Sequence, residues 1–111
     1  MREEVKNWLK QANRDSEVAE KNFKLKEYYS AVFWCQQSVE KGLKALILER
    51  RREKSLSHSL VQLGKEAKVP ENFISKLKKL SPQYFLARYP DASEDVPYDL
   101  YDENITKEFL E

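Results

Sequence analysis

The sequence has few of the residues that turn a chain, cross-link it or carry it into a membrane. Its 111 residues include two glycines, four prolines and one cysteine. A single cysteine excludes an internal disulfide and any zinc site built from several cysteines, and it suits a reducing compartment. The longest apolar run, residues 31–35, is far shorter than a membrane span, and the first residues lack an apolar signal core. We therefore expect a cytoplasmic protein with no membrane segment.

What the sequence does contain is aromatic mass and charge. Two tryptophans, six tyrosines and five phenylalanines imply a packed interior, and the length suits one domain over residues 1–111. The net charge of +1 gives no whole-molecule attraction to nucleic acid, so such binding would need local clusters. Residues 50–54 form a basic cluster, whereas residues 88–103 hold six carboxylates against one basic residue.

Apolar residues recur in steps of three and four along most of the chain, which predicts helices. Over residues 3–24 the small and apolar positions share one face: Val5, Trp8, Leu9, Ala12, Ser16, Ala19 and Phe23. Residues 28–52 are apolar over most of their circumference, so they predict a central helix that runs antiparallel to the first. Cys35 lies in its apolar seam and is interpreted as a core residue.

The second half of the chain predicts shorter helices. Residues 56–67 and 70–80 keep helical spacing, with Leu56 and Phe73 among the expected buried residues, and Pro82 begins a short helix at 83–87. Residues 88–101 have no period and predict a loop that its tyrosines pin in place. A last helix is expected to begin near Asp102 or Asn104, so the fold class is all-α.

The central helix carries one polar stripe, made of Gln37, Glu40, Lys41 and Lys44. Offsets of three, four and seven place these side chains on one face. The lysines could meet phosphates while Gln37 contacts a base or ribose. Alternatively, Glu40 and Lys44 are an ordinary i,i+4 pair on a solvated face.

In residues 29–48, aromatic and small residues precede the pattern Q-x-x-E-K-x-x-K-A, and S-H-S-L at 57–60 and A-R-Y-P-D at 87–91 come after it. These three motifs resemble those of the HEPN domain family and occur in the family's order, the first of them being similar to its second-helix signature. The resemblance implies an up-and-down four-helix bundle with a short extra C-terminal helix. It also implies a homodimer, a nucleotide or RNA ligand, and a nucleotidyltransferase partner in a toxin-antitoxin-like pair. HEPN ribonucleases carry an arginine and, four to six residues later, a histidine near the end of the domain, and here no histidine follows Arg88.

His58 is the only histidine, so any imidazole acid, base or ligand must be this residue. Arg52-x5-His58 has the ribonuclease spacing, but it joins the end of one helix to the start of the next, so we interpret it as coincidental. His58 could act on a ligand, or it could bond a nearby carbonyl or the acidic loop.

Arg88 precedes the acidic loop and has two competing roles. Its guanidinium could bind a phosphate while Tyr89 stacks a base, or it could pair with Asp91 or Glu40 and pin the loop. The basic cluster at residues 50–54 is likewise either a phosphate contact or a solvated helix end.

The leading hypothesis is a nucleotide- or RNA-binding module that presents the stripe, His58, Arg88, Tyr89 and Asp91 to its ligand while a nucleotidyltransferase performs the catalysis. One alternative is a metal-independent endoribonuclease toxin that uses His58 with Arg52 or Arg88. A second alternative is a purely structural dimerisation module. No metal and no cofactor are expected.

Overall fold

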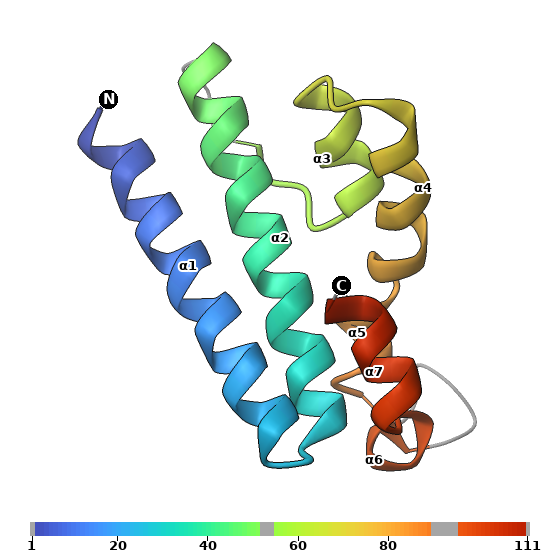
Figure 1. Ribbon diagram of the computed structural model, residues 1–111. Helices are drawn as coiled ribbons and strands as arrows, with labels where there is room; N and C mark the ends of the chain where they lie inside the picture. The colour runs from blue at the N-terminus through green and yellow to red at the C-terminus, as the bar shows by residue number, and fades with distance from the viewer. Residues whose placement is uncertain (1, 52–54, 90–95, 111) are drawn as a thin grey trace.

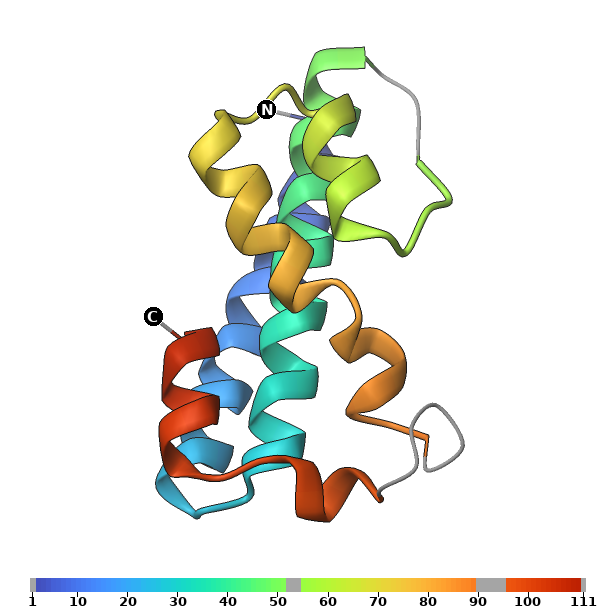
Figure 2. The same ribbon diagram turned by 90° about the vertical axis from the view of Figure 1, so that its right-hand side faces the viewer.

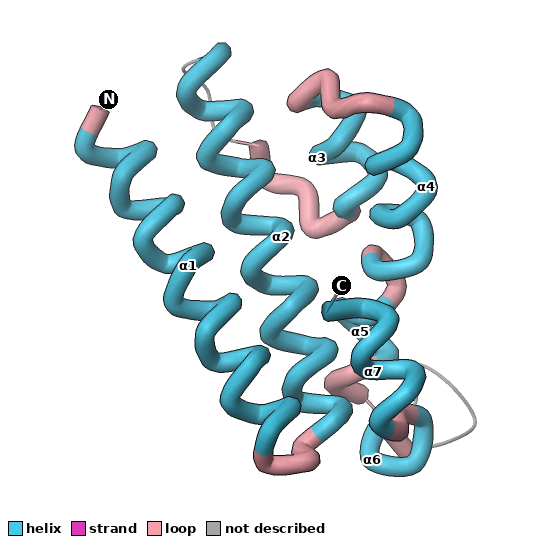
Figure 3. Tube along the Cα trace, in the orientation of Figure 1, coloured by secondary structure: helices cyan, strands magenta, loops and turns pink. Residues whose placement is uncertain are grey.

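The computed structural model describes residues 2–51, 55–89 and 96–110, and within these ranges it contains helices and no strand (Figures 1 and 3). The all-α prediction is therefore confirmed. None of the described helices is long and apolar enough to cross a membrane.

Two long antiparallel helices, α1 (Glu3–Lys24) and α2 (Tyr28–Arg51), form one side of the molecule (Figure 1). The three residues between them reverse the chain because Lys26 adopts a left-handed conformation with φ 63°. The Lys26 amide donates to the Phe23 carbonyl and the Glu27 amide to the Asn22 carbonyl, at 3.0 and 2.8 Å. These two bonds satisfy the last carbonyls of α1 in the Schellman pattern.

Small side chains let α1 and α2 approach closely. Val5, Ala12 and Ala19 recur every seven residues and are buried against α2. The Ser38 hydroxyl donates to the Ala12 carbonyl across the interface at 2.8 Å. One buried position was predicted wrongly, because Ser16 is exposed and the neighbouring Asp15 is 1% exposed.

The helices that follow α2 pack on its other side (Figure 2). They are α3 (Leu60–Glu66), α4 (Glu71–Leu80), α5 (Gln83–Leu86), α6 (Pro97–Leu100) and α7 (Glu103–Leu110). The largest core cluster joins α2, α3 and α4 and consists of Ile47, Leu60, Leu63, Ala67, Ile74, Leu77 and Leu80. A second cluster, around Val32, Ala87 and Tyr101, holds α5 and the segment before α7 against the first turns of α2.

Helix α3 begins at Leu60, four residues later than the sequence predicts. Hydroxyls in the preceding segment bond to main-chain amides: the Ser57 amide donates to Ser55 Oγ, and the Ser59 amide donates to Ser57 Oγ. Ser59 then caps the helix by accepting from the Gln62 amide at 3.3 Å. Such local bonds compete with helix formation, so residues 55–59 are not helical and Leu56 is 89% exposed rather than buried.

Two other predictions need correction. Phe73 is 51% exposed, because the buried face of α4 is formed by Ile74, Leu77 and Leu80 alone. Part of the predicted loop is helical, since Pro97 begins the one-turn helix α6. A proline at the first helical position loses no hydrogen bond, which explains the start that the loop prediction overlooked.

Candidate functional site

The polar stripe of α2 is partly buried, and Glu40 is its centre. This carboxylate is 4% exposed and accepts from three side chains. Gln36 Nε2 donates to Oε1 at 3.1 Å, while Lys44 Nζ and His58 Nδ1 lie 3.1 and 3.0 Å from Oε2. The predicted Glu40–Lys44 pair exists, but it is not on a solvated face, because the Lys44 side chain is 10% exposed. A buried carboxylate requires such compensation.

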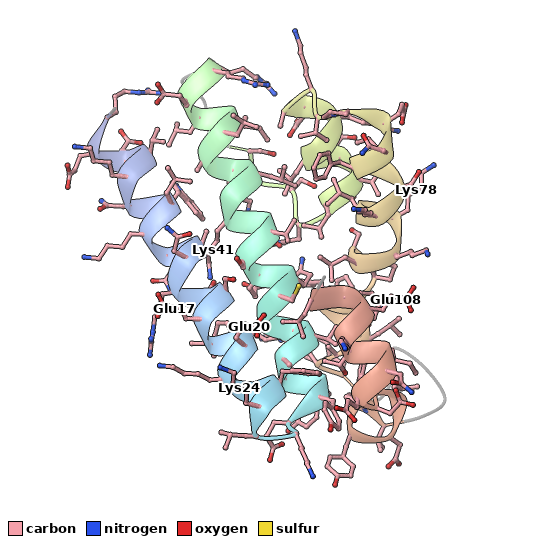
Figure 4. The ribbon with its side chains drawn as sticks, viewed as in Figure 1. Glu17, Glu20, Lys24, Lys41, Lys78 and Glu108 are labelled. Carbon is pink, nitrogen blue, oxygen red and sulfur yellow. The ribbon has the colours of Figure 1, made fainter. Side chains whose placement is uncertain are left out.

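The other two residues of the stripe are directed elsewhere. Lys41 forms an ion pair with Asp15 of α1, and Figure 4 shows its side chain between the ribbons of α1 and α2. Gln37 donates to the Gln36 side-chain oxygen at 2.8 Å. The stripe therefore splits, with Lys41 paired to Asp15 of α1 and Lys44 paired to Glu40, the carboxylate that also contacts His58.

The segment before α3 brings His58 against Tyr84 of α5. Its imidazole stacks on the Tyr84 ring with centroids 4.8 Å apart and an interplanar angle of 17°. The His58 side chain is 55% exposed, although Glu40 holds its Nδ1 atom. One ring nitrogen is thus fixed by a buried carboxylate, which leaves Nε2 as the nitrogen able to act on a ligand.

The guanidinium of Arg88 lies among three aromatic rings. Its Cζ atom is 5.0 Å from the centroid of Phe33, 5.5 Å from that of Tyr84 and 5.2 Å from that of Tyr89. Arg88 is exposed and forms no ion pair with any residue that the structure describes. Glu40 is occupied by other donors, so it is not the partner that pins Arg88.

The ring of Tyr84 joins the two candidate residues, because His58 and Arg88 both contact it. Sequence reasoning did not select Tyr84, although its position four residues before Arg88 places both side chains on one face of a helical turn. Helix α5 is anchored by the Tyr101 hydroxyl, which donates to the buried side-chain oxygen of Gln83. Burial raises the pKa of Tyr101 to about 12, so this hydroxyl keeps its proton and remains a donor well into the alkaline range.

The remaining candidates lie apart from this cluster or outside the described residues. Arg50 donates to the Ala67 carbonyl and Arg51 lies 3.8 Å from Glu66, so both bind α3 and its end. Arg52 and Asp91 fall outside the described residues. Cys35 donates to the Phe109 carbonyl at 3.4 Å, and burial raises the pKa of its thiol to about 11, as expected of a core residue.

The geometry can be compared with that of known proteins. The family model described as the HEPN domain matches residues 5–111. The chain belongs to the HEPN family. The crystal structure of TT1696 from Thermus thermophilus is similar, with a TM-score of 0.87 and 32% identity over 96% of this chain and 87% of that one. The crystal structure of ST0689, an archaeal HEPN homologue, is also similar, with a TM-score of 0.80 and 34% identity over 96% of this chain and 85% of that one. A comparison with curated proteins gave no match.

In this HEPN domain the single histidine precedes α3, and no histidine follows Arg88. The arginine and histidine of the cluster therefore come from different elements and meet through Tyr84, rather than through a short spacing on one helix.

Proposed function

We propose that this HEPN domain binds a nucleotide or an RNA end on the face that joins Glu40, His58, Tyr84 and Arg88. The observation that carries the proposal is the guanidinium of Arg88, which is exposed, has no ion-pair partner among the described residues and is held among three rings. A guanidinium in this state can form paired hydrogen bonds with a phosphate. Because the rings already restrict it, little side-chain freedom is lost on binding.

Neighbouring groups supply the other contacts that a nucleotide needs. Tyr89 is 42% exposed beside Arg88 and offers a ring face to a base, which is the usual means of holding an unpaired base. Nε2 of His58 can donate to or accept from a sugar or phosphate. The lysines contribute less, because Asp15 and Glu40 already neutralise Lys41 and Lys44. Gln37 and Asp91 complete the proposed contact set.

The biological role that we propose is that of a substrate-binding partner. A homodimer of this domain would present the ligand in the cytoplasm to a nucleotidyltransferase, which performs the chemistry in a toxin-antitoxin-like pair. The likeness to the HEPN family supports this role. Co-purification of the tagged protein with such an enzyme from its native host, together with sedimentation at the mass of a dimer, is the expected result.

Titration calorimetry with nucleoside monophosphates and short RNA tests the binding site. We expect Arg88→Ala to weaken binding by about tenfold to 150-fold, the range for a hydrogen bond to a charged group. The slope of log affinity against log salt should also fall by about 0.7, the contribution of one phosphate on a single strand. Lys78→Ala is the control, because it removes an exposed positive charge from α4, a helix that contributes none of the proposed contact residues (Figure 4). Equal losses in both variants, or no binding by the wild type, would reject the site and leave a structural dimerisation module.

The Glu40–His58 contact favours a second candidate, a metal-independent endoribonuclease. A buried carboxylate that bonds one imidazole nitrogen fixes the tautomer, so the other nitrogen can transfer a proton. His58 would take the proton of a ribose 2′-hydroxyl, whose oxygen would bond to phosphorus as the bond to the 5′ oxygen breaks. Water would protonate that oxygen, and Arg88 would stabilise the charge on the phosphorus oxygens.

This candidate predicts RNA cleavage in EDTA that is lost in His58→Ala and reduced in Glu40→Gln. Equal cleavage by the wild type and His58→Ala would identify a contaminating nuclease. Arg52, which lies outside the described residues, is the other arginine to test by substitution.

A further inference from the structure

A shallow hollow on α1 lies at the opposite end of the polar stripe from Arg88. Its volume is about 310 Å³, and its lining consists of Glu4, Asn7, Trp8 and Gln11. This size is at the lower end of the range for small-molecule sites. A flat indole beside two amides and a carboxylate suits a base, because the ring can stack and the polar groups can bond to base edges.

Contacts connect this hollow with the face proposed above. Lys44 Nζ lies 5.8 Å from the Trp8 ring centroid and 3.1 Å from the Glu40 oxygen that also contacts His58. On the other border, Gln11 donates to Asp15 at 2.9 Å, and Asp15 pairs with Lys41. The hollow therefore borders the lysines of α2 on the side of the molecule that carries His58.

Aromatic rings also lie between the hollow beside Trp8 and the guanidinium of Arg88. Lys41 Nζ lies 5.9 Å from the Trp34 ring, which packs edge-on against Phe33 at 5.1 Å, and Phe33 contacts Arg88. Because carboxylates neutralise both lysines, this face offers ring surfaces and the Arg88 guanidinium rather than a row of phosphate-binding charges. Stacking is the interaction that it favours, and single-stranded nucleic acid is the ligand that stacking platforms bind.

The separation of the two ends decides the size of the ligand. Lys44 contacts Trp8 at one end of this face, and Phe33 contacts Arg88 at the other. Lys44 lies eleven residues beyond Phe33 on α2, so the two ends are about 16 Å apart at the helical rise of 1.5 Å per residue. A single nucleotide cannot contact both ends. A short strand can.

We propose that the hollow beside Trp8 is a second base-binding subsite, and that the ligand is a single strand of RNA that runs along α2 from Arg88 to Trp8. This inference rests on the proposed function, since the Arg88 end must bind a nucleotide for the Trp8 end to extend it. It assigns a role to Trp8, Asn7 and Gln11.

The test compares uridine monophosphate with hexauridylate by calorimetry on the wild type and two Trp8 variants. Trp8→Leu removes the ring, while Trp8→Phe keeps a smaller ring, and both change its packing against Val5, Ala45 and Leu48. We expect hexauridylate to bind the wild type at least tenfold more tightly than the monophosphate. Trp8→Leu should weaken hexauridylate about fivefold to 150-fold, the effect of one lost stacked base, and leave the monophosphate unchanged. Trp8→Phe should retain most of the affinity.

Phe73→Leu is the matched control, because Phe73 is an exposed ring with Lys76 Nζ 5.7 Å from its centroid, but it lies on α4. It should change neither affinity. The second subsite is wrong, and the proposed function stands, under one combination of results. The monophosphate still binds in a way that depends on Arg88, but hexauridylate binds no more tightly than the monophosphate and Trp8→Leu changes neither affinity. Absence of binding by both ligands would overturn both. Circular dichroism and the thermal midpoint separate loss of folding in Trp8→Leu from loss of the ring.

Discussion

Removing the Tyr101 hydroxyl tests how the site-bearing helix α5 is held. Tyr101 and Gln83 are 9% and 8% exposed, and the hydroxyl donates to the Gln83 side-chain oxygen. In Tyr101→Phe that buried oxygen loses this donor and the site offers little access to water. We expect a loss of about 1 to 3 kcal/mol in the free energy of unfolding, the usual cost of an unsatisfied buried polar group. For a domain of this size the thermal midpoint should fall by about 4 °C for each kcal/mol.

The double variant Tyr101→Phe with Gln83→Leu separates the two possible causes of that loss. When both partners of a buried hydrogen bond become apolar, the cost of the unpaired group disappears. We expect the double variant to recover most of the stability that Tyr101→Phe loses, as measured by urea unfolding. A wild-type midpoint for Tyr101→Phe, or a double variant as unstable as the single one, would refute this account.

Three further predictions concern stability. An added Cβ at Gly64 would lie 2.5 Å from a methyl group of Leu77, whereas at Gly42 it would meet nothing within 4 Å. Gly64→Ala should therefore lower the free energy of unfolding by about 1 to 3 kcal/mol, and Gly42→Ala should raise it by about 0.5 to 1 kcal/mol. The urea midpoints of the two variants should move in opposite directions. Burial raises the pKa of Cys35 from 9.0 to about 11, so the thiol's contribution to stability is complete below pH 9 and is lost as the pH rises towards 11. Over this pH range the free energy of unfolding should fall by about 2 to 3 kcal/mol through Cys35. Cys35→Ala should not show this fall when its unfolding is measured at the same pH values. Lys26→Gly should raise the free energy of unfolding by about 1 kcal/mol, because glycine adopts the left-handed conformation without the steric cost; an unchanged thermal midpoint would contradict this.

The sequence predicts the helices of this fold well, because amphipathic spacing is a local property. The bounds of α1 match the expectation, and α2 follows the predicted reversal. Errors occur where a tertiary or main-chain contact overrides the pattern. Ser55 and Ser57 bond to main-chain amides and delay α3, and Asp15 is buried because Lys41 of another helix compensates it.

The candidate site was only partly accessible to sequence reasoning. The stripe on α2, His58 and Arg88 could be selected from their residue types and from the family resemblance. Their arrangement could not be derived, because the stacking of His58 on Tyr84 depends on the path of residues 55–59 across α2. The division of the two lysines depends on α1, which supplies Asp15 to one of them.

The short connection between α1 and α2 bears on the order in which the domain acquires its parts during synthesis. The hairpin is complete within the first 51 residues, and contacts between neighbouring segments form fastest. We expect Trp8, Lys41 and Lys44, which belong to the hairpin, to be synthesised before α3 to α5 and to come together first. Arg88 can reach the ring of Tyr84 only when α5 docks, so under the proposed function a chain interrupted before that helix would lack the phosphate contact.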